Sequence, residues 1–336
     1  METPTTPTGA AWTGPRWRRR ALVALVVLLV LGTLAYLYAS SVVYDQISLT
    51  AAKCGGRFTA NTPAAFTAAP VDTAPYLMAD YQTTTFPSRD PEITISAWYI
   101  PVATTTPGSA VVLVHGHDSC KREDAMVLAA GMLHKDGVAI LLIDMRNHGD
   151  SSVPNGRFAG GTREYRDALS GYDWLVNTQG YAPDRVGLLG MSLGAATVLI
   201  ATGEEPRVAA VWSDSSYADL DVAIQAELVR NDRPTWLRYG GYLMARVRSG
   251  DDLLSLSPLN AMSKLDGRPI FIVHGTADTR VAPSYAADLA TAVRAHGGTV
   301  DPWMVDGSEH TQSILDQPAE YERRLDAFFE AALGAN

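Results

Sequence analysis

Short, continuously apolar runs alternate with longer helical patterns along most of this 336-residue chain, and this alternation restricts the fold more than any other feature. Runs that are apolar at every position are typical of strands buried on both faces of a parallel sheet. Such runs lie at 110–114, 138–143, 185–189, 208–212 and 269–273, with a further strand expected at 299–305. Helical patterns lie at 123–135, 163–177, 193–202, 284–296 and 319–333. The chain is therefore predicted to be a doubly wound α/β fold with a mostly parallel sheet and reactive groups at the carboxyl ends of its strands.

Two segments depart from this alternation. Residues 93–100 alternate with a period of two, which predicts a half-exposed antiparallel strand. Residues 215–258 interrupt the rhythm with helical pieces around 219–229 and 234–247. We therefore expect one α/β domain over residues 75–336 that carries a small helical cap insertion at 215–258.

The amino-terminal region has the pattern of a membrane helix. A cluster of four arginines precedes residues 21–39, an uncharged apolar run long enough to cross a bilayer as a helix. Tyr36 and Tyr38 lie at the far end of this run, where aromatic rings favour the membrane interface. An uncleaved transmembrane anchor is predicted at 21–39. A cleaved signal peptide is the alternative, with a passable cleavage site at residues 39–41.

The arginine cluster orients this predicted anchor. By the positive-inside rule, a tail at residues 1–20 stays in the cytoplasm, and the domain at residues 75–336 lies outside the cell membrane. Residues 40–74, rich in Ala, Thr and Pro, are predicted to be a linker. Cys54 and Cys120 would then face an oxidising compartment, where they could pair or stay free.

Composition limits the partners of the chain. With 47% apolar and 19% charged residues, the chain can build a large core. The formal net charge is −9, and because four basic residues belong to the amino-terminal cluster, the rest of the chain is more acidic still. Such a body repels phosphate backbones, so we expect no nucleic-acid partner.

Residues 190–194, with the sequence GMSLG, form a G-x-S-x-G motif. An apolar strand pattern at 185–189 leads into the motif, and a helical pattern at 193–202 leaves it. This is the strand–turn–helix in which a serine sits on a strained turn with its hydroxyl exposed. Ser192 is therefore the predicted nucleophile.

A serine hydroxyl needs a base, and the base needs a third group to orient it. Among the seven histidines, His310 lies between the last predicted strand and the last helix, at the sheet edge that carries Ser192. Asp278 follows the strand at 269–273 and gives the chain order Ser, Asp, His typical of this architecture. Asp214, which follows the preceding strand, is the alternative acid.

An acyl-transfer site also needs donors for the developing oxyanion. The backbone N–H groups of Leu193, directly after the nucleophile, and His117, in the loop after the strand at 110–114, are the predicted donors. His115, His117 and Asp118 resemble part of a metal motif, but no second ligand pair has a convincing spacing. We therefore expect no bound metal.

Five ordered motifs relate the chain to a known superfamily. They are VVLVHG at 111–116, the loop at 144–151, GMSLG at 190–194, HGTAD at 274–278 and GSEH at 307–310. From about Thr83 to its end the chain resembles the α/β-hydrolase superfamily, within it the acyl esterases, lysophospholipase-like enzymes and prolyl-oligopeptidase-like catalytic domains. Asn147 stands where that superfamily usually has a smaller residue in a structural loop. The resemblance implies a Ser192–His310–Asp278 triad and hydrolysis without a cofactor.

The predicted function is a membrane-anchored serine hydrolase that cleaves carboxylic esters, lipid esters among them. A serine peptidase or amidase of the same fold and a non-catalytic binding protein with a hydrolase fold are the alternatives. The expected cap has apolar side chains able to cover an acyl chain: Trp236, Leu237, Tyr239, Tyr242, Leu243 and Met244. It also carries Arg230, Arg233, Arg238, Arg246 and Arg248. These arginines fit either an ordinary solvated helix face or a surface for membrane headgroups or an anionic substrate.

Overall fold

The computed structural model describes residues 15–50, 54, 60–103 and 108–334. In this part of the chain eight strands form one sheet, in the order β1-β2-β4-β3-β5-β6-β7-β8. The strands are β1 Gln82–Pro87, β2 Thr94–Ile100, β3 Ala110–Val114, β4 Ala139–Ile143, β5 Val186–Met191, β6 Val211–Asp214, β7 Ile270–Gly275 and β8 Trp303–Val305. Strands β3 to β8 run parallel, whereas β1 and β2 are antiparallel to their neighbours. The predicted mostly parallel α/β sheet is confirmed.

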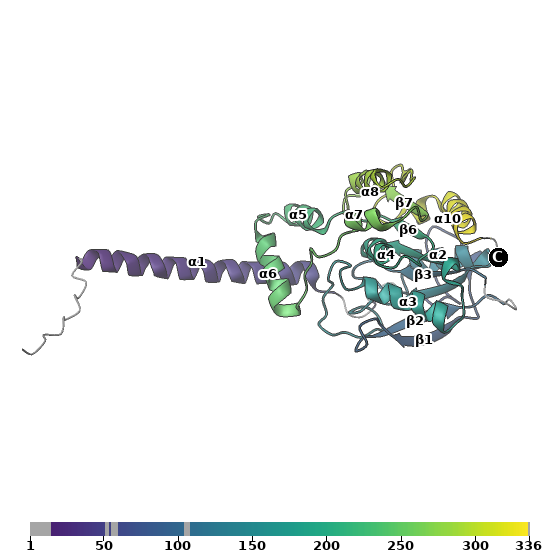
Figure 1. Cartoon of the computed structure of the whole chain (residues 1–336), viewed down its shortest axis with the longest axis horizontal. Coiled ribbons are helices and arrows are strands. Elements are labelled where there is room, and N and C mark those ends of the chain that lie inside the picture. Colours follow the sequence, from purple (N-terminus) through teal and green to yellow (C-terminus); the bar gives the residue numbers. More distant parts are fainter. Residues whose placement is uncertain (1–14, 51–53, 55–59, 104–107, 335–336) are drawn as a thin grey trace, which may run out of the picture.

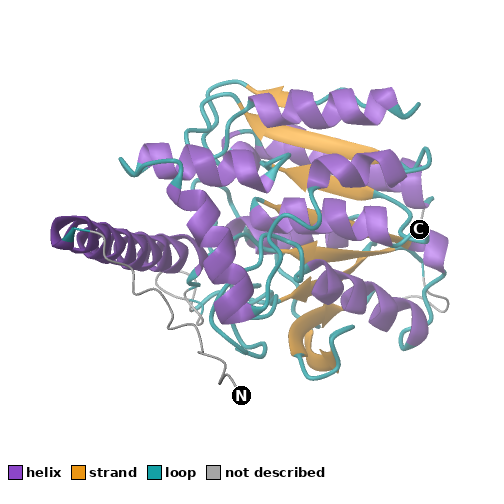
Figure 2. Ribbon diagram, turned by 60° about the vertical axis from the view of Figure 1, so that its left-hand side comes forward, coloured by secondary structure: helices purple, strands orange, loops and turns teal. Residues whose placement is uncertain are grey.

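Helices cover both faces of this sheet (Figure 2). The larger helices of the body are α2 Asp124–Lys135, α3 Tyr165–Asn177, α4 Leu193–Glu204, α8 Ser284–Ala295 and α10 Pro318–Leu333. Short helical turns are η2 Ala74–Tyr76, η3 Pro183–Arg185, α7 Pro258–Ala261, η4 Met262–Lys264 and α9 Ser313–Asp316. Apolar side chains of α3, α4 and α8 belong to one core cluster, and those of α2 and α10 belong to the other. The sheet therefore separates two cores, which is why its central strands are apolar at every position.

Helix α1, Arg16–Ser48, extends away from the body (Figure 1). None of its most apolar stretch is buried, and α1 is long and apolar enough to cross a membrane. A signal sequence would also meet these two criteria of length and composition. The helix continues nine residues beyond the predicted end at Ala39. In these added turns Ser40, Val43 and Tyr44 are buried, because they pack against helix α6, Leu237–Ser249.

The predicted linker at 40–74 is thus wrong over much of its length. Its first part is the end of α1, and its last part, from residue 60, packs on the body through Phe66 and Ala68. Cys54 forms a disulfide with Cys120, with 5.5 Å between the two Cα atoms. Residues 1–14 of the predicted tail and residues 51–53 and 55–59 of the predicted linker lie outside the described residues.

Helices α5, Leu220–Arg230, and α6 lie between β6 and β7, where two helical pieces of a cap are predicted. Ion pairs within the protein hold most of the arginines in this segment. Arg230 pairs with Glu227, Arg238 with Asp221, Arg246 with Asp252 and Arg248 with Asp45 of α1. This pairing matches the reading of these arginines as an ordinary solvated helix face.

Three strand predictions need correction. Strand β2 is antiparallel as expected but is buried on both faces, because Trp98 and Ile100 enter one core while Ile95 enters the other. Strand β6 begins at Val211 rather than residue 208, and β8 begins at Trp303 rather than residue 299. Strand β1 is absent from the predicted elements because its sequence, QTTTFP, is mostly exposed at the sheet edge and has little apolar signal.

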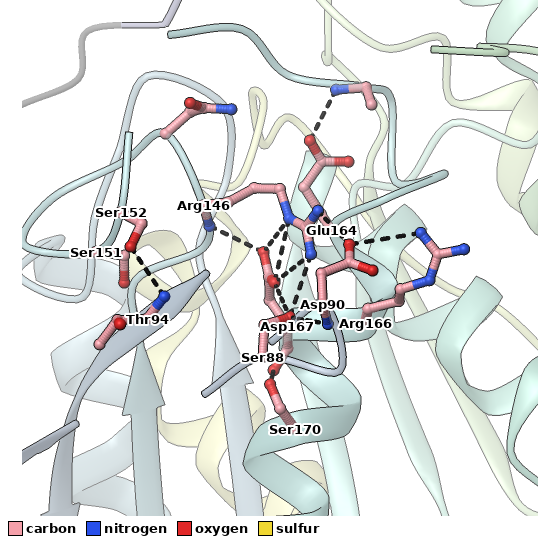
Figure 3. A network of polar contacts seen from close by, with 12 residues as sticks. Ser88, Asp90, Thr94, Arg146, Ser151, Ser152, Glu164, Arg166, Asp167 and Ser170 are labelled. Carbon is pink, nitrogen blue, oxygen red and sulfur yellow. Dashed lines mark hydrogen bonds and ion pairs between the residues drawn. The ribbon is translucent and has the colours of Figure 1, made fainter. Parts of the chain in front are cut away.

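A buried ion-pair network ties the loop after β4 to helix α3 (Figure 3). The guanidinium of Arg146 donates to both carboxylate oxygens of Asp167, with an Nη2–Oδ1 distance of 2.7 Å, and Arg146 Nη1 lies 2.6 Å from Asp90 Oδ2. Ser88 Oγ donates to Asp167 Oδ1 at 2.7 Å. Asp167 is fully buried and Arg146 is 4% exposed, so each charge depends on the other for compensation.

We expect Arg146→Ala to lower the free energy of unfolding by about 3–5 kcal/mol, because it leaves the Asp167 carboxylate buried without its cation. Urea unfolding of the full chain in detergent micelles, followed by tryptophan fluorescence, measures this loss. Arg323→Ala is the matched control: it breaks a surface pair with Glu320 that solvent screens, so the free energy of unfolding should stay close to that of the wild type. Equal losses in the two variants would contradict the role given to burial.

Candidate active site

Ser192 occupies a tight turn between β5 and α4. Its backbone has φ 56° and ψ −120°, a strained conformation for a residue with a side chain. The neighbouring glycines make the turn possible: a Cβ on Gly190 would collide with the carbonyl of Gly194, and one on Gly194 would collide with that of Val114. The strand–turn–helix predicted from the motif is therefore present, and it presents the Ser192 hydroxyl at the carboxyl end of β5.

His310 lies in the loop between β8 and α9 and reaches Ser192. Its Nε2 is 2.8 Å from Ser192 Oγ, and its Nδ1 is 2.7 Å from Asp278 Oδ2. These distances are hydrogen bonds, so the hydroxyl, the imidazole and the carboxylate form one continuous chain. The structure brings together the three residues that the motifs single out, from the ends of three different strands.

Asp278 follows β7 and its side chain is buried. Burial alone would raise the pKa of this carboxyl, but hydrogen bonds with His274 and His310 and with the backbone N–H of Val281 outweigh it and hold the pKa well below its usual value. The N–H groups of Arg280 and Val281 donate to Oδ1 at 2.9 and 2.8 Å. The carboxylate therefore stays ionised opposite His310.

His274 is a member of the site that sequence reasoning missed. Its Nε2 lies 3.1 Å from the same Oδ2 of Asp278 and 3.0 Å from the carbonyl oxygen of Val281. The sequence placed His274 only at the end of a strand, in a His-Gly pair. Its spacing of four residues from Asp278 is the signal that could have linked the two side chains.

Asp214, the alternative acid, lies at the end of β6. Its carboxylate accepts hydrogen bonds from Tyr321 Oη and Ser215 Oγ, both at 2.9 Å, and burial raises its pKa. Its carbonyl oxygen accepts the Ser192 backbone N–H at 2.9 Å. Of the two candidate acids, Asp278 is the one hydrogen-bonded to His310 in the described part of the chain. Asp214 instead supports the serine turn through its backbone carbonyl.

The predicted oxyanion donors flank the serine. Leu193 is the first residue of α4, and its side chain and that of His117 line the same cleft as Ser192. The loop that carries His117 passes close to the nucleophile, since a Cβ on Gly116 would lie 3.2 Å from Ser192 Cβ. His115 is fully buried and accepts the Met145 backbone N–H at 3.1 Å. In the part of the chain that the structure describes, no group of three or more His, Cys, Asp or Glu side chains could hold a metal ion.

A cleft of about 270 Å³ opens at Ser192. Parts of the chain that are distant in sequence line it: the end of α1, the loops after β3, β4, β6 and β7, the turn at Ser192, and helix α5. The lining residues are Gln46, Ile47, His117, Asp118, Phe158, Ser192, Leu193, Tyr217, Leu220, Ala223, Ile224, Glu227, Arg280 and Val281. The presence of Gln46 and Ile47 means that the helix expected only to anchor the protein also forms part of the cleft wall.

Burial lowers the pKa of His117 to about 4, so its ring is neutral at pH 7. An unfolded histidine titrates near 6.5, so between pH 6.5 and 4 the unfolded state binds more protons and stability falls as the pH falls. Relative to His117→Gln, the wild type should lose on the order of 3 kcal/mol more on going from pH 7 to pH 4. Urea unfolding at the two pH values measures this difference. Parallel losses in the two proteins would contradict a neutral, half-buried His117.

A serine on a strained strand–turn–helix, hydrogen-bonded to a histidine on a mostly parallel sheet, defines a serine hydrolase of the α/β-hydrolase fold. The chain belongs to the prolyl oligopeptidase family, which it matches over residues 127–336.

Similar solved structures share this fold. An esterase of Pyrococcus furiosus, Pf2001, aligns with a TM-score of 0.60 and 23% identity, over 76% of this chain and 94% of that one. The acylaminoacyl peptidase of Pyrococcus horikoshii aligns with a TM-score of 0.59 and 17% identity, over 76% of this chain and 42% of that one. These neighbours include both an esterase and a peptidase, and at this identity they show the fold alone.

Curated relatives match less of the chain. The uncharacterized protein YfhR of Salmonella typhi is 26% identical over 217 residues, 60% of this chain and 65% of YfhR. The thiohydrolase aneE of Aspergillus aculeatus is 30% identical over 106 residues, 32% of this chain and 33% of aneE. The match thus spans just under two thirds of YfhR.

Proposed function

We propose that the protein is a membrane-anchored serine hydrolase that cleaves carboxylic esters through an acyl-enzyme, with Ser192, His310 and Asp278 as its triad. The observation that carries this proposal is the unbroken hydrogen-bond chain from Ser192 Oγ through both ring nitrogens of His310 to Asp278 Oδ2. Each of the three groups has the partner that its role requires.

The reaction follows from this geometry. His310 Nε2 takes the proton of Ser192 as the hydroxyl attacks the ester carbonyl, and Asp278 stabilises the imidazolium that forms. The backbone N–H groups of Leu193 and His117 stabilise the negative oxygen of the tetrahedral intermediate. The alcohol leaves with the proton from His310, and a water molecule then hydrolyses the acyl-enzyme by the same sequence of steps.

Helix α1 supports placement of the catalytic domain on the outer side of the cell membrane. The cluster of Arg16, Arg18, Arg19 and Arg20 at its start favours a cytoplasmic amino terminus. The disulfide between Cys54 and Cys120 fits an oxidising compartment on the other side. We propose residues 21–39 as the membrane-spanning part and residues 215–258 as a cap over the cleft.

A peptidase or amidase is the second candidate, and two carboxylates that line the cleft, Asp118 and Glu227, favour it. A carboxylate in the cleft could bind a substrate amine, and Glu227 lines it. However, the Glu227 carboxylate is already hydrogen-bonded to Arg230 and Asn231. The apolar lining around Ile47, Phe158 and Ile224 suits an acyl chain better, so ester hydrolysis leads.

Turnover of p-nitrophenyl esters from acetyl to dodecanoyl by the full chain in detergent tests this proposal. We expect turnover of esters to exceed that of the matching acyl p-nitroanilides, because the cleft offers an apolar wall and no unpaired carboxylate among the described residues that line it. A preference for aminoacyl anilides would favour the peptidase. A folded protein inactive on both substrate series would favour a non-catalytic binding protein.

A further inference from the structure

Helix α6 crosses α1 where the apolar run of α1 ends. Trp236, at the start of α6, stacks on Tyr36 with 5.6 Å between ring centroids. Gly240 packs directly against Ser40: a Cβ on Gly240 would collide with the Ser40 hydroxyl. The contact between the helices therefore begins at Tyr36, next to the end of the proposed membrane span at residue 39, and continues along α1 as far as Asp45.

The direction of α6 follows from the same contact. In Figure 1, α6 runs across the axis of α1, and Figure 2 shows it beside the carboxyl-terminal end of that helix. A helix that lies across a membrane-spanning helix lies along the membrane surface. At the level of Tyr36, that surface is the boundary between headgroups and acyl chains, where tyrosine and tryptophan rings concentrate.

Helix α6 exposes an apolar stripe, defined here as Trp236, Tyr239, Leu243 and Val247. The four side chains are 54%, 59%, 46% and 70% exposed. Their spacing of three, four and four residues places them on one face of the helix. The opposite face, with Leu237, Gly241 and Ala245, is buried. Trp236 stacks on Tyr36 and Arg238 lies over the ring of Tyr239, yet all four stripe residues stay exposed beside a helix that itself requires lipid.

Charges beside the stripe are compensated within the protein. Arg246 is paired with Asp252, and Arg248 is paired with Asp45 and hydrogen-bonded to Ser41 of α1. The two contacts of Arg248 hold α6 against α1. Because the arginines are engaged, the apolar stripe is the surface left to contact the bilayer.

The cleft at Ser192 lies close behind this crossing. Ile47 is seven residues past Ser40, which is about 10 Å along a helix. Val43, Tyr44 and Ile47 of α1 also face Tyr242 of α6 in an apolar cavity between the two helices. An amphiphile at the crossing therefore has apolar side chains between the membrane boundary and the catalytic serine.

We propose that the apolar stripe of α6 is a second membrane contact, which lies in the boundary between headgroups and acyl chains and holds the mouth of the cleft at the bilayer surface. The occupant of the stripe is the lipid bilayer that α1 crosses, and the substrates that this arrangement favours are esters dissolved in it. The proposal rests on the anchor and the ester hydrolysis proposed above.

The first test places an NBD fluorophore on the full chain in phosphatidylcholine nanodiscs. Native Cys54 and Cys120 are paired, so Leu243→Cys supplies a single thiol for labelling on the stripe. Met304→Cys, on edge strand β8, is the matched control at an exposed apolar position away from α1. We expect spin-labelled lipids to quench the probe at position 243 several-fold more than the probe at 304. Equal quenching would overturn the proposal. Quenching could instead be weak at both sites, with shielding of position 243 that rises with protein concentration. That result would overturn the membrane contact and show that the stripe binds a second copy of the chain.

The second test measures activity in the same nanodiscs with Tyr239→Glu/Leu243→Glu. The sequence pattern placed Tyr239 and Leu243 among side chains able to cover an acyl chain, but the structure leaves both exposed and neither lines the cleft. Turnover of water-soluble p-nitrophenyl acetate should therefore match the wild type, and it serves as the control for folding. Turnover of a long-chain ester dissolved in the bilayer should fall about tenfold, because charges on the stripe oppose its burial among lipids. An equal rate on the bilayer ester would overturn the proposal. If the wild type cleaves neither ester, the proposed ester hydrolysis fails, while the fluorophore test still decides the membrane contact.

Discussion

Ser192→Ala is expected to lower kcat for p-nitrophenyl esters by about six orders of magnitude, to the residual level that oxyanion stabilisation and binding provide. The substitution removes the Oγ atom that lies 2.8 Å from His310 Nε2, and no acyl-enzyme can then form. Stopped-flow measurement of the nitrophenolate burst reports the covalent step, and steady-state turnover reports the whole cycle. The burst should disappear in the variant, because it reports acylation of the hydroxyl that the substitution removes.

A matched serine controls for general effects of the substitution. Ser263→Ala removes an exposed hydroxyl that donates to the Asn260 carbonyl, far in sequence from the site, and should leave both burst and turnover unchanged. A burst that persists in Ser192→Ala would reject Ser192 as the nucleophile. Loss of the burst in both variants would point instead to damage of the fold.

Asp278→Asn is expected to lower kcat by about four orders of magnitude. The carboxylate accepts a hydrogen bond from His310 Nδ1–H and compensates the charge of the imidazolium. An amide in its place can donate to Nδ1, which stabilises the tautomer with its proton on Nε2, and that tautomer cannot accept the proton of Ser192. The fall should appear in kcat with KM little changed, since Asp278 is not among the residues that line the cleft.

The comparison with Asp214→Asn separates the two candidate acids. The Asp214 carboxylate accepts hydrogen bonds from Tyr321 and Ser215, so an asparagine at this position should lower the free energy of unfolding. The kcat of this variant should stay within about tenfold of the wild-type value. The reverse order of the two kcat values would assign the acid to Asp214. Thermal unfolding of both variants separates a catalytic loss from a structural one.

The parts of the fold that could be predicted are those with strong local patterns. Central strands such as 110–114 are apolar throughout because both faces are buried, and the GMSLG turn carries its own glycines. The motifs place Asp278 and His310 at the ends of strands. Because parallel strands bring their carboxyl ends to one edge of the sheet, the sequence alone predicts that both residues lie near Ser192.

What could not be predicted depends on tertiary contacts. Strand β1 is polar because it lies at an edge, so its sequence resembles a loop. The end of α1 is rich in small and polar residues, and Ser40 is buried only because Gly240 of α6 lets the two helices approach closely. His274 meets Asp278, and Gln46 reaches the cleft, through packing between elements that no local pattern records.

The end of α1 connects the proposed membrane anchor directly to the wall of the cleft. Gln46 and Ile47 form part of the cleft wall, and the disulfide retains only the chain from Cys54 onward. A protease that cut between Ser48 and Cys54 would therefore release a domain with one wall of its substrate cleft missing. Release by such a cut would therefore change which substrates fit the cleft, and the released form would differ from the anchored form in substrate specificity.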